Sequence, residues 1–175
     1  MSVACGTKWN IVETYNASPG NSNAALAIGI ATAGGDFGGT FQNQVWSKGV
    51  QLYSGAAVRS YCVSSYRQTA GTWSNIANAR LDVYGSTTDA TSLNTFLNNM
   101  ATGDLLVLST YDEPATNKSY FDTNLRDNFG AQVAASAFEV RCLYLLVAVK
   151  GRKLPIYERY ERRFTAWFGA SLWTG

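Results

Sequence analysis

The sequence predicts an α+β fold, in which two antiparallel β-sheets form a compact sandwich with two flanking helices, extended by a β-rich N-terminal arm. Short apolar runs bounded by Gly, Asn, Ser or Pro recur along the chain, as is typical of strands. One stretch carries the apolar period of an amphipathic helix. Between Gly103 and Ala131 an apolar run, an acidic turn and a second helical pattern follow one another.

The N-terminal arm is predicted to comprise residues 1–46. Lys8–Tyr15 and Ala24–Ala31 have the composition of short strands, and they are joined by the turn-rich segment ASPGNSN. The glycines of TAGGDFGGT mark a second connection. A segment so rich in Gly, Asn and Ser has little side-chain mass with which to form a core, so we expect it to pack on residues 47–175 or on another chain.

The main domain is expected to begin with strands. Two strand-like runs lie within Phe37–Tyr53, separated by SKG. The alternation of Val58–Tyr66 predicts a half-buried strand, and Asn75–Gly85 predicts its partner across a long connection. An amphipathic helix follows, with Thr88 or Asp89 as its cap. Its apolar residues recur at i, i+3, i+4 and i+7: Leu93, Phe96, Leu97 and Met100.

Leu105–Leu108 predicts a strand that is buried on both faces. Pro114 ends the extended segment because it lacks a backbone donor. Ser119 and Asp122 resemble a capping box, and Gly130 is the expected end of the helix that follows. The longest apolar strand candidate, Glu139–Gly151, is expected in the interior of a sheet.

A chain of 175 residues suits one domain with a sizeable core. Residues 1–149 carry eight Lys or Arg and ten Asp or Glu, a net charge of −2, whereas residues 150–175 carry six and two, a net charge of +4. The total of +2 argues against a nucleic-acid-binding face. The basic, aromatic tail is more consistent with a solvated or oligomer-facing segment.

The sequence begins without a basic and then apolar leader, so we expect no signal peptide. It contains no run of about 20 apolar residues, so we expect no membrane insertion. Three cysteines, Cys5, Cys62 and Cys142, cannot close an intramolecular disulfide framework and are expected to be buried hydrophobes or thiols.

The chain contains no histidine, which removes the commonest general base and most zinc sites. Asp112 and Glu113 are adjacent, so their side chains should diverge, although a facing pair of Asp112 with Asp82 stays open. We predict no catalytic residue, no metal site and no cofactor.

Asp112 lies at the end of one apolar strand and Arg141 at the start of another. One interpretation is a structural ion pair between neighbouring strand ends. The other is a small polar cleft in which Asp112 and Arg141 hold sugar hydroxyls near the rings of Tyr111 and Tyr144. Further candidate ring platforms, each also consistent with ordinary core or rim, are Tyr61, Tyr66, Trp73 and Tyr84.

The run LLVLSTYDEPAT, the following helix and NFGA resemble the signature segment of the interleukin-like EMT inducer domain family, also called PANDER-like or GG-type lectin domains. The flanks agree in order, with ARLDVYGSTTDATSLNTFLNNMATGD before this segment and EVRCLYLLVAVKG, LPIYE and Trp167 after it. The resemblance spans about two thirds of the chain. Cys142 stands where the family usually has Asp, and Tyr144 where it has Trp.

This resemblance implies glycan binding, because the positions of Asp112 and Arg141 match sugar-contacting residues of the family. Such domains occur in cell-surface proteins, in a glycosyltransferase stem and in tail proteins of bacterial viruses. We therefore expect a non-enzymatic carbohydrate-binding module, a tail-associated bacteriophage protein that attaches to the host surface. It would be made in the host cytoplasm, and its partners would be a glycan, other virion proteins and copies of itself. The alternative is a purely structural virion subunit that assembles through its arm and tail.

Overall fold

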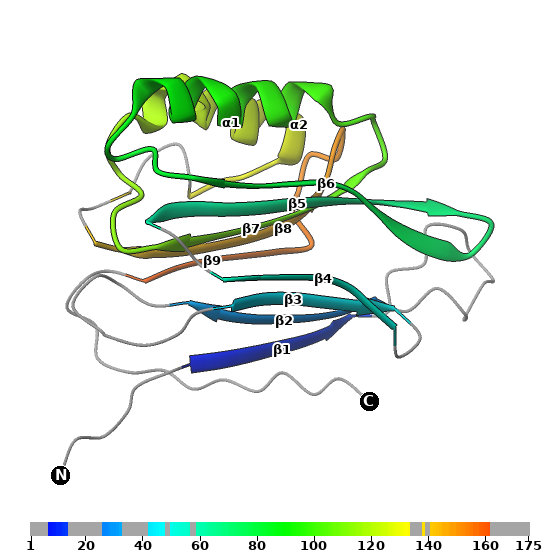
Figure 1. Cartoon of the computed structure of the whole chain (residues 1–175). Coiled ribbons are helices and arrows are strands. Elements are labelled where there is room, and N and C mark those ends of the chain that lie inside the picture. The colour runs from blue at the N-terminus through cyan, green and yellow to red at the C-terminus, as the bar shows by residue number, and fades with distance from the viewer. Residues whose placement is uncertain are drawn as a thin grey trace, which may run out of the picture.

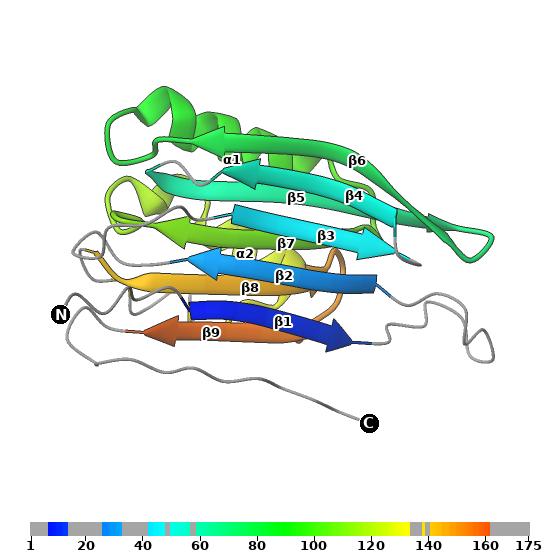
Figure 2. The ribbon, with the colours of Figure 1, turned by 60° about the horizontal axis from the view of Figure 1, so that its bottom comes forward.

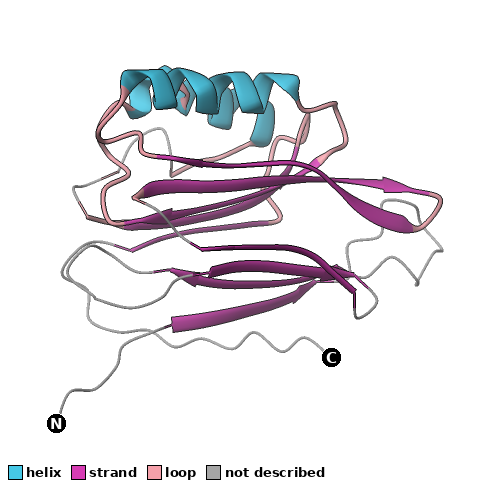
Figure 3. Ribbon diagram, in the orientation of Figure 1, coloured by secondary structure: helices cyan, strands magenta, loops and turns pink. Residues whose placement is uncertain are grey.

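The computed structural model describes residues 7–13, 26–32, 42–47, 50–56, 59–133, 138 and 141–161. These residues form three layers, with two helices above a five-stranded sheet and a four-stranded sheet below it (Figure 1). Both sheets are antiparallel, and strands make up most of the regular structure (Figure 3). The predicted α+β class, with two antiparallel sheets and two helices, is therefore confirmed.

The four-stranded sheet is an antiparallel meander in the order β1-β2-β3-β4. Its strands are β1 (Thr7–Glu13), β2 (Leu26–Thr32), β3 (Gln42–Ser47) and β4 (Val50–Ala56). Strands were predicted at each of these places. The boundary predicted between residues 46 and 47 falls within β3, whereas the change from one sheet to the other comes after β4. An independent arm stays a prediction.

The five-stranded sheet has the order β6-β5-β7-β8-β9. Its strands are β5 (Ser60–Thr69), β6 (Thr72–Leu81), β7 (Leu105–Tyr111), β8 (Leu143–Val149) and β9 (Tyr157–Glu161). The long connection predicted between the first two is wrong. Both strands run on to a two-residue turn, Ala70 and Gly71, whose φ values of 49° and 77° suit a tight hairpin. β8 lies inside the sheet, as predicted.

The helical layer consists of α1 (Thr87–Asn99), a 3₁₀ turn η1 (Lys118–Tyr120) and α2 (Asp122–Phe129). Ser86 caps α1 by accepting the Asp89 N–H at 3.1 Å, so the predicted cap at Thr88 or Asp89 is wrong. The capping box predicted from Ser119 is also wrong, because that residue lies in η1 and Phe121 occupies the N-cap of α2.

Gly130 ends α2 in the left-handed conformation, with φ 71°, as predicted. Among the described residues, neither helix has the length and apolar character needed to cross a bilayer.

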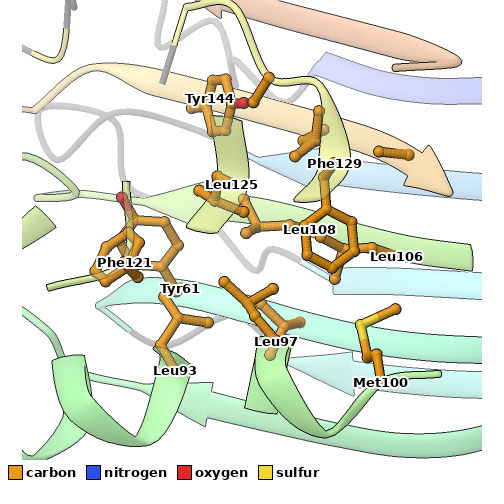
Figure 4. Close-up of a cluster of buried hydrophobic side chains, with 14 of the residues drawn as sticks. Tyr61, Leu93, Leu97, Met100, Leu106, Leu108, Phe121, Leu125, Phe129 and Tyr144 are labelled. Atoms are coloured by element: carbon orange, nitrogen blue, oxygen red, sulfur yellow. The ribbon is translucent and has the colours of Figure 1, made fainter. Parts of the chain in front are cut away.

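Strand alternation divides the buried side chains between two cores, one on each face of the five-stranded sheet. The helix-side core joins Leu93 and Leu97 of α1 to Leu106 and Leu108 of β7 and to residues of α2 (Figure 4). The inter-sheet core lies on the opposite face and is formed by Val45, Tyr66, Trp73, Leu105, Val107, Leu145, Val147 and Val149.

Strands of the two sheets run in similar directions, one sheet over the other (Figure 2). The prediction that Leu105–Leu108 is buried on both faces is confirmed.

Candidate functional site

The end of β7 and the segment before β8 bring together the two charged residues that the sequence singled out. Arg141 Nε lies 3.8 Å from Asp112 Oδ1, and the side chains are 42% and 29% exposed, respectively. This distance is within the range of an ion pair but longer than a direct hydrogen bond. The pair lies at the end of the sheet where β5 begins and α1 starts (Figure 1). We call this region the acidic corner: Arg59, Ser60, Asp82, Tyr84, Asp112, Glu113 and Arg141.

The backbone of the acidic corner is unusually strained. In the described part of the chain, five residues other than glycine have positive φ. Ala70 belongs to the tight β5–β6 turn, and three of the other four lie in the acidic corner: Ser60 at 103°, Asp112 at 65° and Arg141 at 61°. The fourth, Asn117 at 59°, follows the acidic turn. Asp and Asn adopt this region readily, but at Ser60 and Arg141 it costs about 1 to 3 kcal/mol each and persists only where surrounding contacts fix it. The acidic corner therefore requires contacts that hold its backbone in place.

Glu113 supplies most of these contacts. Its side chain is 4% exposed, and each carboxylate oxygen accepts one backbone N–H. Oε1 takes the N–H of Ala115 at 3.0 Å, and Oε2 takes that of Arg141 at 3.1 Å. The Glu113 carbonyl accepts the hydroxyl of Ser60 at 2.7 Å. One buried residue thus ties the acidic turn to β5 and to the backbone of Arg141.

Three further hydrogen bonds connect the start of β5, the segment before α1 and the acidic turn. The Tyr61 hydroxyl donates to the Pro114 carbonyl at 2.9 Å, and Ser60 Oγ accepts the backbone N–H of Tyr84 at 3.1 Å. Asn117 Nδ2 donates to the Val83 carbonyl at 2.8 Å. The segment before α1 and the segment before α2 are therefore held to the same strand end.

A second ion pair flanks the first. Arg59 contacts both carboxylate oxygens of Asp82, with Nε donating to Oδ1 at 2.9 Å, and its guanidinium lies 4.7 Å from the centre of the Tyr84 ring. The hydrogen bond from Arg59 lowers the pKa of Asp82, and the bond to Asp82 raises the pKa of Arg59, with a smaller contribution from the charge of Asp112. Because Asp82 is engaged by Arg59, it is not a vacant second carboxylate opposite Asp112.

The two predicted tyrosines are not brought together. Strand alternation puts Tyr111 on the face of β7 that carries Leu105 and Val107, where it is only partly buried. Tyr144 lies on the other face, is 1% exposed and donates its hydroxyl to Glu158 Oε1 at 2.7 Å. Burial raises the pKa of that hydroxyl well above its usual value. Tyr144 is thus a core residue, and its ring is not a surface platform.

Among the other candidate rings, Tyr61, Tyr66 and Trp73 are buried, and Tyr84 is 48% exposed at the acidic corner. Sequence reasoning missed the roles of Ser60, Glu113 and Arg59. The sequence pattern could have indicated Arg59, because this residue lies at the start of a predicted strand, Val58–Tyr66, just as Arg141 does.

Within the described residues, no group of three or more Cys, Asp or Glu side chains is arranged to hold a metal ion. Cys62 and Cys142 are buried, as expected, and Cys5 lies outside these residues.

A search against protein-family models finds no match to this chain, and neither does a search of curated proteins. The resemblance to interleukin-like EMT inducer domains therefore stays a prediction, and the main structural indication of a function is the geometry of the acidic corner.

Proposed function

We propose that the chain is a non-enzymatic carbohydrate-binding module and that Asp112 and Arg141 contact the sugar. The observation that carries the proposal is the 3.8 Å Asp112–Arg141 pair, partly exposed and held on strained backbone by the buried Glu113. An ordinary surface ion pair contributes about 0 to 1 kcal/mol, less than the strain that the positive φ of Arg141 costs. Stability alone is therefore a poor reason for this arrangement.

The chemistry of the pair suits sugar hydroxyls. A carboxylate only accepts hydrogen bonds, a guanidinium only donates them, and a hydroxyl does both. Vicinal hydroxyl groups of a sugar can therefore bridge Asp112 and Arg141, whose closest charged atoms are beyond direct hydrogen-bond distance. Tyr84 adds an exposed ring to the same corner, and the apolar face of a sugar can rest on the side of the ring that Arg59 leaves open.

The proposed biological setting is a tail-associated protein of a bacteriophage virion that attaches to carbohydrate on the host surface. The family resemblance supports it. The genes that flank this one test it: tail genes on either side are expected, and a neighbourhood without viral genes would contradict it.

A purely structural virion subunit is the alternative, and the sheet edges favour it. β1 and β4 are the outer strands of the four-stranded sheet, and unpaired strand edges are templates for pairing with another chain. Here we propose a compact sandwich of the two sheets, with residues 1–46 serving as an arm that contacts neighbouring copies. Val50, 64% exposed on β4, offers a probe. Val50→Lys should block incorporation into particles if that edge pairs, and normal incorporation counts against pairing through β4.

The sugar site is tested on a glycan array with Asp112→Asn and Arg141→Gln. Asn tolerates positive φ, so the first variant should keep the fold. Each loses a hydrogen bond to a charged group, about 1.5 to 3 kcal/mol, so affinity should fall about tenfold to a hundredfold. Arg67→Gln is the matched control, because Arg67 is 47% exposed and also pairs with a carboxylate, that of Asp104 at 2.7 Å, near the opposite end of β5. Unchanged glycan binding by both corner variants would refute the site.

A further inference from the structure

A second concave surface lies between α1 and α2, which run side by side in the outer layer (Figure 3). It has a volume of about 270 Å³ and is lined mainly by four asparagines, Asn94, Asn98, Asn124 and Asn128. We call it the amide groove. Its volume is close to the lower end of small-molecule sites, about 300 Å³, which suits one sugar-sized unit better than a nucleotide.

Helix geometry explains why the amides meet. On α1 the two asparagines each follow a core leucine by one residue, which turns them about 100° away from the sheet. On α2 the two asparagines each precede a core residue, Leu125 and Phe129. The flanks that carry the amides therefore face each other above the core. Both pairs have i, i+4 spacing, so the groove follows the helix axes.

The amides form a connected network. Asn124 Nδ2 donates to Asn94 Oδ1 and to Asn98 Oδ1, both at 2.8 Å, and Asn128 Nδ2 donates to Asn124 Oδ1 at 2.9 Å. Asn124 is 9% exposed and occupies the centre. Because the Oδ1 atoms of Asn94 and Asn98 turn towards it, their Nδ2 groups point elsewhere. Neither Nδ2 donates a hydrogen bond to a described residue, so the amide groups of Asn94 and Asn98 are oriented donors that a ligand can use.

Packing alone is a weak explanation for this network. Asparagine is a poor helix former because its amide competes with the backbone for hydrogen bonds. Apolar residues would join two helices without that penalty. Four asparagines at the same interface are better explained if the spare amide atoms bind something.

Charge and shape restrict what can bind. Asp127 is the one ionised residue among those lining the groove, and it is engaged by Arg126, which donates from Nε to Oδ1 at 2.8 Å. No lining residue is basic, so a phosphate or another anion has no counter-charge. Tyr120 adds an aromatic ring that is 47% exposed. Directional amides beside one exposed ring match a neutral, polyhydroxylated ligand.

We propose that the amide groove is a second carbohydrate subsite that binds one neutral sugar unit. Asn94 and Asn98 donate to its oxygens, Asn128 Oδ1 accepts from a hydroxyl, and Tyr120 packs against its apolar face. The subsite is separate from the acidic corner and does not rest on the role proposed for Asp112 and Arg141. Asn94 lies eight residues beyond Ser86, the cap that adjoins the corner, or about 12 Å along α1.

The test is a nuclear magnetic resonance titration of the full ¹⁵N-labelled chain with glucose, N-acetylglucosamine and, as a charged comparison, glucuronate. The side-chain NH₂ signals of Asn94 and Asn98 should shift saturably with a neutral sugar, with Kd on the order of 1 mM, as is usual for a ligand of this size. Glucuronate should bind more weakly because of Asp127. Absence of saturable shifts with both neutral sugars would overturn the proposal.

Two tyrosines of matched exposure separate the sites. Tyr120→Ala should weaken binding to the groove about five- to tenfold, the loss expected when roughly 50 Å² of apolar contact is removed, and Tyr120→Phe should retain it. Tyr84→Ala, at a residue 48% exposed in the acidic corner, should leave these shifts unchanged. If Tyr120→Ala has no effect, or Tyr84→Ala has the larger one, the groove is not the subsite. Loss of array binding in Asp112→Asn with intact groove shifts would still support the corner, so the two proposals fail separately.

Discussion

Replacing the buried Glu113 by Gln should destabilise the protein although it removes only one charge and no volume. The two carboxylate oxygens accept the N–H groups of Ala115 and Arg141. A glutamine keeps one acceptor oxygen and puts an NH₂ group where the other was. One backbone N–H then faces a donor and loses its partner, so the strained turn loses one of its two anchors.

The magnitude follows from that lost bond. A hydrogen bond to a charged group contributes about 1.5 to 3 kcal/mol, and a buried donor left without a partner falls in the same range. We therefore expect the free energy of unfolding to drop by about 2 to 3 kcal/mol. For a chain of this size each kcal/mol lowers Tm by roughly 2 to 4 °C, so the expected fall is roughly 4 to 12 °C.

Urea unfolding followed by circular dichroism measures this change. The midpoint should fall with little change in the m-value, because the same surface is exposed on unfolding. The control is Asp127→Asn, which neutralises an exposed carboxylate and should change stability by less than about 0.5 kcal/mol. Glycan binding by Glu113→Gln should weaken as well, because the Arg141 backbone is no longer fixed. If both variants unfold at the wild-type midpoint, Glu113 is not the anchor.

Three further changes test other parts of the fold. Gly130→Ala should lower the free energy of unfolding in urea by about 3 kcal/mol or more, because φ is 71° and the new Cβ would meet the backbone of the β8–β9 connection. Gly103→Ala, with φ 93° and nothing within 4 Å of the new Cβ, should lower it by about 1 to 2 kcal/mol. Equal losses would contradict the role of the contact at Gly130. Burial acts to raise the pKa of Asp104, but hydrogen bonds from a guanidinium and a backbone N–H hold it below the usual value. The stabilisation by Asp104 is present above the unfolded-state pKa of about 3.9 and is lost as the pH falls through the lower folded-state pKa. Asp104→Asn should therefore lower the free energy of unfolding at pH 7 and flatten the decline of stability below about pH 4. An unchanged slope of stability against pH would contradict this role of Asp104. Tyr144→Phe should lose about 1.5 to 3 kcal/mol through its bond to Glu158 without changing glycan binding, and a loss of binding would show that the Tyr144 hydroxyl supports the sugar site.

The sequence predicted most strands because short apolar runs between turn residues survive in almost any tertiary setting. It missed β9, whose sequence YERYE has two charged residues between its tyrosines and no apolar run. Among the described strands it pairs with β8, the strand just before it, and Tyr157 packs into the inter-sheet core. Its existence depends on that pairing and packing rather than on an apolar pattern of its own. The N-cap of α1 was predicted at the wrong residue because all four residues of STTD, 86–89, have side chains that can cap a helix.

The candidate site was predicted in part for a similar reason. Asp112 and Arg141 stand at the ends of two apolar runs, and adjacent antiparallel strands bring such ends together. The face that a strand residue takes depends on register, however, and a shift of one residue moves it to the other side. The local pattern therefore does not distinguish Tyr144 from Tyr111. It also predicts that the Glu113 side chain points away from the site. The inward turn of Glu113 accompanies a positive φ at Asp112, and the local pattern does not predict that backbone conformation.

The position of the inter-sheet core has a consequence for synthesis on the ribosome. β3 and β4 contribute Val45, Leu52 and Tyr53 to that core, but their partners on β8 emerge about 90 residues later. At about 5 to 20 residues per second, a core begun with Tyr66 and Trp73 waits roughly 5 to 20 s for the β8 residues that complete it. A nascent chain stalled before β8 should be sensitive to proteolysis and dependent on chaperones, and release of the last strands should abolish both.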